Sequence, residues 1–339
     1  MSAMSDVAVT GGAGFLGSNL VKRLLDDGHT VSIVDDLSSG SVENLRGLGI
    51  DRDCLLGDLK HYEFARRSLR GAQAVFHLAA EVGSVAYLHG SDARELAALQ
   101  SNLVIDANVF RACLENKVRS IVYASSVSVY PFDQQLGAHV RFREEDSERV
   151  NPEGGYGWAK YIGEKQLGLM PDTSFGIARI FHAYGENLYL RPDRSQVIAS
   201  LIGKAVRYPS EDFVVWGDGS QRRCFVYVND AMDAIMRLWA HVEKRGSLVV
   251  NVGSTEEVTV RQLASMVISL SGKRIEPKYD ESKPTGALSR MPNLDRAKEV
   301  LGWSPTTSFS EGLRKTYAWA EKRLTTDSES DQSPKRPRQ

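Results

Sequence analysis

Short, continuous apolar runs recur along the chain and alternate with segments of helical spacing. Runs of only three to five residues suit strands that are buried on both faces, as in a parallel sheet. After the first run, Leu16, Leu20 and Leu24 recur every four residues, and Gly28 is expected to end that helix. The alternation predicts an α/β fold built on a doubly wound parallel sheet with right-handed crossovers. The predicted strands span residues 7–10, 31–34, 54–56, 74–78, 121–124, 176–180 and 248–252.

The rhythm changes after residue 180, which predicts a second, smaller lobe. Residues 186–223 are rich in proline, glycine, arginine and aromatic residues, and residues 253–324 carry helical patterns that prolines interrupt. We expect these two stretches to form a mixed α/β lobe at the carboxyl end of the sheet, and residues 1–185 and 224–252 to form the main domain. Residues 325–339 are polar and lack an apolar anchor, so a disordered tail is predicted there.

The first predicted strand runs directly into a glycine-rich turn that contains Gly11, Gly14 and Gly17. Glycines at this spacing, between a strand and a helix, let the backbone approach a pyrophosphate at the amino end of the helix. The second strand ends at Asp35 and Asp36, where a carboxylate can accept hydrogen bonds from ribose hydroxyls and would repel a 2′-phosphate. The pattern predicts a Rossmann-type dinucleotide-binding domain, with NAD favoured over NADP as the cofactor.

Tyr156 and Lys160 stand four residues apart and indicate a reaction centre. On a helix they share one face, and we expect the ammonium group to lower the pKa of the phenol and to hold the nicotinamide ribose. Tyr156 would then serve as a general base near neutral pH. The same spacing is frequent on solvated helices, and the glycine-rich turn upstream favours the catalytic interpretation. Ser126 ends the preceding strand, where a doubly wound sheet binds its ligand.

Charge and composition exclude several functional classes. The chain has 42 Lys and Arg against 43 Asp and Glu, a net charge of −1, so neither a nucleic-acid partner nor an anionic membrane is expected. No apolar run reaches the roughly 18 residues of a membrane span, and no signal peptide is recognised. Cys54, Cys113 and Cys224 are scattered, which predicts free thiols in a reducing, cytoplasmic compartment and neither a disulfide framework nor a metal site.

Taken together, these motifs resemble the extended short-chain dehydrogenase/reductase superfamily, in particular its NAD-dependent nucleotide-sugar epimerases and dehydratases. The resemblance covers about residues 6–322. Beyond the glycine turn, Tyr156 and Lys160, it rests on Asn102, Arg223 and segments 77–80, 125–126, 216–219 and 301–305. Segments 80–84, 123–131 and 216–228 most resemble the GDP-mannose 3,5-epimerase group.

The resemblance implies a substrate, a partner and two sets of binding residues. The smaller lobe is expected to bind a nucleotide diphosphate sugar, with Arg223 and Arg290 on the phosphates, because a guanidinium pairs bidentately with phosphate. Helices around residues 96–114 and 156–169 are expected to pair in a homodimer. The implied cofactor-binding residues are Gly11, Gly14, Phe15, Leu16, Gly17, Asp35, Asp36, Ser39, Asp58, Leu59, Leu78, Ala79, Ala80, Asn102, Tyr156, Lys160 and Phe181. The implied substrate-binding residues are Glu81, Gly83, Ser84, Ser126, His182, Gln196, Val197, Arg223 and Arg290.

The resemblance also implies a mechanism. Tyr156 removes a proton from a sugar hydroxyl, and the carbon that bears this hydroxyl gives its hydride to NAD⁺. The transient ketone that results later takes the hydride back. The NAD is therefore regenerated within the site and not released. Tyr156, Lys160, Ser126 and Ser128 form the implied catalytic set.

Departures from the family pattern bear on which carbon is inverted. Dehydratases and decarboxylases of the superfamily carry an acidic residue where this chain has Val127 and Ser128. The 3,5-epimerase group carries Cys at Ser128 and Lys at Gln196 as its second base and acid, and neither Ser nor Gln titrates near neutral pH. Inversion at C4 needs only Tyr156, Lys160 and a hydroxyl, so C4 epimerisation of a UDP- or GDP-linked sugar is favoured.

Two alternatives stay open. A dehydratase or a 3,5-epimerase-like enzyme with altered acid–base residues would use Glu81 or His182 in place of the missing groups. A dinucleotide-sensing regulatory protein on the same fold would need no chemistry. Loss of Tyr156 or Lys160 would be expected in such a protein, and both residues are present.

Overall fold

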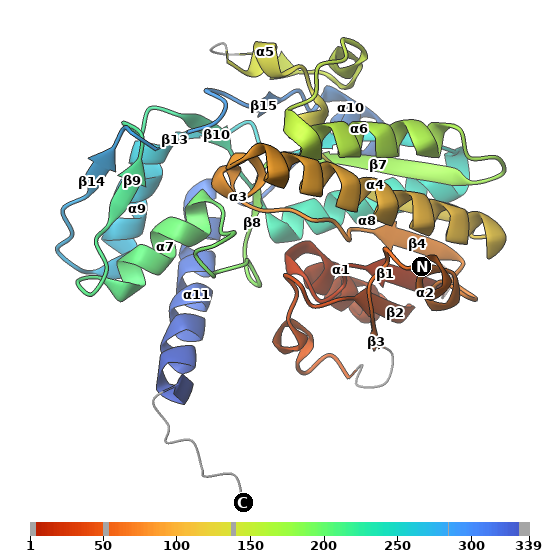
Figure 1. Cartoon of the computed structure of the whole chain (residues 1–339), viewed down its shortest axis with the longest axis horizontal. Coiled ribbons are helices and arrows are strands. Elements are labelled where there is room, and N and C mark those ends of the chain that lie inside the picture. Colours follow the sequence, from red (N-terminus) through yellow and green to blue (C-terminus); the bar gives the residue numbers. More distant parts are fainter. Residues whose placement is uncertain (1–4, 50–53, 137–139, 284, 332–339) are drawn as a thin grey trace, which may run out of the picture.

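The seven apolar runs form one parallel sheet. The computed structural model describes residues 5–49, 54–136, 140–283 and 285–331, and within them the strands of this sheet lie in the order β12-β7-β5-β4-β1-β2-β3. Every neighbouring pair is parallel, which confirms the predicted fold class (Figure 1). The strands are β1 Asp6–Thr10, β2 Thr30–Asp35, β3 Cys54–Leu56, β4 Ala74–His77, β5 Ser120–Ser126, β7 Ser174–Ile180 and β12 Leu248–Val252.

Helices cover both faces of the sheet. On one face, α1 (Phe15–Asp26) and α8 (Val228–Arg245) bury apolar side chains against the strands. On the other face lie α2 (Tyr62–Ser68), α4 (Asp92–Glu115) and α6 (Gly154–Gly168), with α4 beside α6 (Figure 1). Gly28 follows the end of α1 with φ of 86°, a left-handed conformation that ends the helix as predicted.

The smaller lobe is built from short strand pairs and three longer helices. β9 (Val214–Trp216) pairs with β14 (Lys278–Asp280), and β10 (Arg222–Cys224) pairs with β13 (Glu257–Thr259). These pairs join the two stretches, 186–223 and 253–324, that the sequence assigned to the lobe, while the exact domain boundaries stay a prediction. The helices of this part are α7 Val197–Arg207, α9 Val260–Ser271 and α11 Phe309–Asp331.

Shorter elements connect these layers. The remaining helices are α3 Val85–His89, α5 Phe132–Gln135 and α10 Asp295–Leu301, and the 3₁₀ turns are η1 Val42–Leu45, η2 Val127–Val129 and η3 Glu144–Glu148. The remaining strands are β6 Arg141–Phe142, which pairs with β15 Met291–Pro292, and β8 Ala183–Tyr184, which pairs with β11 Val226–Tyr227.

The predicted start of a disordered tail at residue 325 requires correction. Helix α11 continues to Asp331, and the hydroxyl groups of Thr325 and Thr326 donate to backbone carbonyls one turn earlier. Leu313 and Tyr317 anchor the first half of the helix in the core, and an anchored helix propagates at little cost even through polar residues. The last part of the predicted tail, residues 332–339, lies outside the described residues.

The three cysteines are free. Cys113 and Cys224 are buried, and Cys54 is partly buried. Within the described ranges, no group of three or more His, Cys, Asp or Glu side chains is arranged to hold a metal ion. None of the helices in the same ranges combines the length and hydropathy that a bilayer span requires.

Candidate active site

A cavity of about 690 Å³ lies where the carboxyl ends of the strands meet the smaller lobe. The strand order reverses between β1 and β4, and ligands of doubly wound sheets bind at such a switch point. Every cofactor- and substrate-binding residue predicted from the sequence lines this cavity, with two exceptions, Asn102 and Phe181. Residues more than 200 positions apart, such as Gly11 and Arg290, therefore contribute to one cavity.

The two exceptions lie behind the cavity wall. Asn102 is buried in α4, where its amide donates to the backbone carbonyl of Glu81 and accepts from the backbone N–H of the same residue. It orients the loop that carries Glu81 and does not face the cavity. Phe181 is fully buried and packs against Tyr130 in a separate apolar cluster. The assignment of these two residues to the cofactor stays a prediction.

The glycine-rich turn is shaped for a close backbone approach. Gly11 has φ of 69°, and a Cβ there would lie 2.8 Å from the backbone nitrogen of Ala79. A Cβ on Gly17 would lie 2.0 Å from the carbonyl oxygen of Gly11, so the turn and the first turn of α1 can touch only without side chains. The N-cap residue of α1, Gly14, provides no side-chain capping bond, which leaves the amino end of the helix facing the cavity for an anion.

Asp35, the predicted ribose acceptor, ends β2 in the cavity wall. The Asp35 carboxylate accepts hydrogen bonds from the backbone N–H groups of Ala13 (2.9 Å) and Leu37 (2.8 Å). Burial raises the pKa of Asp35, and these two hydrogen bonds oppose the increase. A carboxylate has about four acceptor positions, so Asp35 keeps capacity for ribose hydroxyls. Asp36 is exposed and accepts from the Ser38 N–H at 2.9 Å. The turn, the free helix end and Asp35 together fit a dinucleotide.

Tyr156 lies on α6 within the cavity wall, and its phenol is hydrogen-bonded to Ser126. Burial raises the pKa of Tyr156 to about 12, although the hydrogen bond with Ser126 lowers it in part. The expectation that Lys160 lowers this pKa is therefore not met by the protein alone. Lys160 is itself buried, with its ammonium 4.4 Å from the centre of the Tyr123 ring, and burial lowers the pKa of Lys160.

A buried series of hydrogen bonds lies next to Lys160 and includes Tyr123, whose ring the ammonium group contacts. The His77 ring joins Thr10 Oγ1 (2.7 Å) to Asp106 Oδ1 (3.0 Å), and Tyr123 donates to Asp106 Oδ2 (2.6 Å). His77 is fully buried. The sequence analysis did not identify Asp106. The one sequence signal for Asp106 was a carboxylate on the buried side of a helical pattern. The charge of Asp106 raises the pKa of Lys160.

The part of the cavity lined by β10 and the segment before β15 holds a charged cluster, in which the sequence analysis did not identify Glu153. Arg223 and Arg290 are both 8% exposed, and Arg290 forms an ion pair with Glu153. Glu153 also accepts a hydrogen bond from Ser128 Oγ at 3.1 Å. His182 stands beside this cluster with φ of 45°, and burial, followed by the charges of Arg223 and Arg290, holds its pKa well below the usual value.

Glu81, the other acid–base candidate, lies on the loop between β4 and α3. Its carboxylate accepts a hydrogen bond from the Tyr87 hydroxyl at 3.0 Å, and the ring of Tyr87 lies between the guanidinium groups of Arg94 and Arg194. Because Arg194 belongs to the smaller lobe and Arg94 to α4, these contacts join the two parts of the protein at the cavity mouth.

Comparison with known proteins agrees with this site. Residues 7–253 match the NAD dependent epimerase/dehydratase family. GDP-mannose 3,5-epimerase 1 of Oryza sativa subsp. japonica is 28% identical over 94% of this chain and 82% of its own length. UDP-glucose 4-epimerase of Thermotoga maritima, solved with UDP-glucose, has a TM-score of 0.80 at 28% identity and covers 94% of this chain and 99% of its own. MoeE5 in complex with UDP-glucose and NAD has a TM-score of 0.77 at 31% identity, with the same coverage. The chain belongs to the NAD-dependent epimerase/dehydratase family.

Proposed function

We propose that this protein is a nucleotide-sugar epimerase that inverts C4 of a UDP- or GDP-linked sugar through a transient ketone. The observation that carries the proposal is that Tyr156, Ser126 and buried Lys160 line the same cavity as the glycine-rich turn. The relatives solved with UDP-glucose support a substrate of this class.

The chain's own residues account for the proton steps. Ser126 orients the reacting hydroxyl beside Tyr156, and the phenolate of Tyr156 accepts its proton. NAD⁺, when bound, supplies a hydride acceptor that can return the hydride to either face of the ketone. Lys160 provides a buried positive charge that favours the phenolate. Burial raises the pKa of Tyr156 to about 12 and Ser126 opposes the increase, so added positive charge from a bound cofactor would favour the phenolate further.

The buried arginines support a diphosphate ligand. Burial and the neighbouring Arg290 lower the pKa of Arg223 to about 10, so Arg223 stays protonated at neutral pH. Two guanidinium groups against one carboxylate, Glu153, leave a net positive charge at this end of the cavity. A nucleotide diphosphate would neutralise this charge through bidentate contacts.

The test is a panel of UDP-, GDP-, dTDP- and CDP-sugars incubated with the purified protein and followed by NMR. Appearance of the C4 epimer, with unchanged mass, supports the proposal. A product that has lost water would instead support the second candidate, a dehydratase that uses Glu81, whose carboxylate lines the cavity. No conversion of any sugar would refute both.

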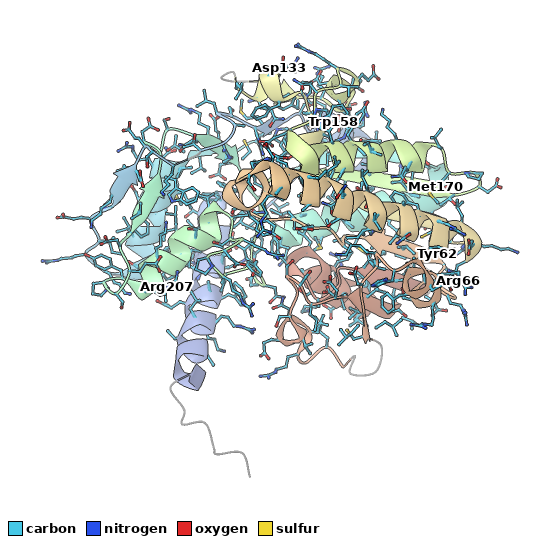
Figure 2. All side chains as sticks on the ribbon, in the orientation of Figure 1. Tyr62, Arg66, Asp133, Trp158, Met170 and Arg207 are labelled. Atoms are coloured by element: carbon cyan, nitrogen blue, oxygen red, sulfur yellow. The ribbon has the colours of Figure 1, made fainter. Side chains whose placement is uncertain are left out.

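We also propose a cytoplasmic homodimer. The support for the dimer is a set of exposed apolar side chains on adjacent helices, with Leu96 and Val104 on α4 and Trp158 on α6. Figure 2 shows Trp158 at the surface of the molecule. The support for the location is the set of free cysteines. Size-exclusion chromatography with light scattering is expected to give twice the mass of one chain for the wild-type protein. The variant Trp158→Glu is expected to give the mass of the monomer. A wild-type monomer would refute the dimer, and cell fractionation tests the location.

A further inference from the structure

A buried carboxylate in the cavity wall, beside Arg290, has no assigned role. Glu153 precedes α6, is 6% exposed and lines the cavity. Its Oε2 accepts a hydrogen bond from Ser128 Oγ at 3.1 Å and contacts Arg290 Nη2. Its backbone N–H donates to the Ser128 carbonyl at 2.9 Å, so the backbone and the side chain of Glu153 are both held against Ser128.

The ordinary structural roles of such a carboxylate do not explain this position. Glu153 is the N-cap residue of α6, yet its side chain makes no capping hydrogen bond. The amino end of α6 is capped instead by Glu95, which accepts from the Gly155 N–H. A buried ion pair is weak evidence for stability, because desolvation offsets the attraction. In addition, Arg290 Nε is buried and has no hydrogen-bond partner within the described residues, so the pair is not a closed structural network.

The position of Glu153 relative to Tyr156 is what a second acid–base group requires. The two residues are three positions apart, one turn along α6, and both line the cavity. Ser126 is bonded to Tyr156, and Ser128 is bonded to Glu153, so neighbouring hydroxyls of one loop orient the two groups. A ligand that contacts Tyr156 would therefore lie in the same cavity as the Glu153 carboxylate.

The other candidates are less well placed. The Glu81 carboxylate accepts a hydrogen bond from Tyr87 on α3, so α3 orients it and not the turn η2 that carries Ser128. His182 is buried beside two guanidinium groups, and these disfavour the protonated imidazole that an acid–base cycle would need. Glu153 instead forms an ion pair with Arg290 and accepts a hydrogen bond from Ser128 at the cavity wall.

We propose that Glu153 is a second acid–base residue, which exchanges a proton on the ring carbon next to the transient ketone. This inference rests on the proposed function, because only the ketone makes that C–H bond acidic. The carboxylate takes the proton, the C–H electron pair forms a carbon–carbon double bond, and the former carbonyl electrons move to the oxygen near Tyr156. Reversal returns a proton to carbon and restores the ketone, so no further oxidant or reductant is required. The site would then handle C3 or C5 as well as C4.

The test is turnover in D₂O with whichever nucleotide sugar the wild-type protein converts. Hydride return alone leaves solvent deuterium out of the sugar carbons, whereas exchange by Glu153 places deuterium at C3 or C5. Glu153→Gln keeps the hydrogen bonds to Ser128 and Arg290 and loses the titrating group. We expect this variant to lower the rate of deuterium incorporation by about 10²- to 10⁴-fold. Bound NAD and calorimetric affinity for the nucleotide sugar are expected to stay at the wild-type level.

The chain offers a matched control. Glu243 also accepts a hydrogen bond from a serine, Ser120, but Glu243 does not line the cavity. Glu243→Gln is expected to exchange deuterium at the wild-type rate. A second variant, Ser128→Ala, leaves Glu153 in place without its hydrogen bond, and we expect an intermediate loss of exchange.

Two outcomes would overturn the assignment and are distinguishable from each other. If the wild-type protein forms NADH and inverts C4 without deuterium at C3 or C5, Glu153 is not an acid–base residue and the proposed function stands. If the wild-type protein converts no nucleotide sugar, the proposed function fails and the assignment fails with it. Unchanged deuterium incorporation in Glu153→Gln would also refute the assignment, whatever the effect of Ser128→Ala.

Discussion

Arg179 on β7 and Glu164 on α6 form a two-pronged ion pair in the protein interior. Arg179 Nη2 lies 2.7 Å from Glu164 Oε2, and Arg179 Nε lies 3.0 Å from Oε1. Each side chain is only 5% exposed. Arg179 also donates to the Glu144 carbonyl and to Ser147, so this one side chain ties the helix that carries Tyr156 to the sheet.

Removal of Arg179 is expected to destabilise the protein strongly. Arg179→Met leaves Glu164 as an unpaired buried charge, which costs about 3–5 kcal/mol in the free energy of unfolding. Urea denaturation measures this loss. Arg66→Ala is the control, because Arg66 pairs with Glu63 on the surface, where they are 41% and 73% exposed, and an exposed pair contributes little to stability. Equal losses in the two variants would contradict the role given to Arg179.

Tyr156→Phe is expected to abolish turnover and leave NAD bound. The substitution removes the phenol that takes the sugar proton and keeps the ring that packs on α6, so we expect the rate to fall about 10²- to 10⁴-fold. NMR measures the rate, and the absorbance of the NAD released on denaturation measures occupancy. Tyr161→Phe, on the same helix but outside the cavity, is expected to retain activity. Substantial turnover in Tyr156→Phe would remove Tyr156 as the base.

A methyl group on Gly17 is expected to weaken cofactor binding. Its Cβ would lie 2.0 Å from the Gly11 oxygen and 2.6 Å from Gly12 Cα, and strain of about 1–3 kcal/mol is typical of such overpacking. We expect NAD to bind about tenfold to hundredfold more weakly, measured by calorimetry on the stripped protein. Gly168→Ala is the control, since no atom lies within 4 Å of a Cβ there. Full NAD affinity in Gly17→Ala would show that the turn tolerates a side chain.

His182 is expected to make the fold sensitive to acid. Burial and two neighbouring guanidinium groups hold its folded pKa well below the ordinary 6.5. Below pH 6.5 His182 is protonated in the unfolded chain and stays neutral in the folded chain. The free energy of unfolding therefore falls as the pH falls. The loss is about 1.4 kcal/mol for each pH unit below 6.5, until the folded pKa is reached.

His182→Asn removes this titration. Asparagine tolerates the positive φ of 45° at this position. Denaturation at a series of pH values between about 7.5 and 5.5 is expected to show a shallower slope for the variant than for the wild type. Identical slopes would show that His182 contributes nothing to acid sensitivity.

Local patterns determined the fold and most of the cofactor site. The seven strands were readable because a strand buried on both faces requires a continuous apolar run. Gly11, Gly17, Asp35 and Tyr156 were readable because their chemistry depends on spacing within a single strand, turn or helix. Each of these four residues lines the cavity.

Tertiary packing alone decided the rest. Glu153 meets Ser128 and Arg290 only because α6, the loop after β5 and the segment before β15 converge at one end of the cavity. Asn102 and Phe181 match the family's pattern, yet packing places both behind the wall. The pKa of Tyr156 depends on its burial more than on the spacing to Lys160. Burial, charge pairing and orientation are set by residues distant in the chain, and no local pattern of side chains contains that information.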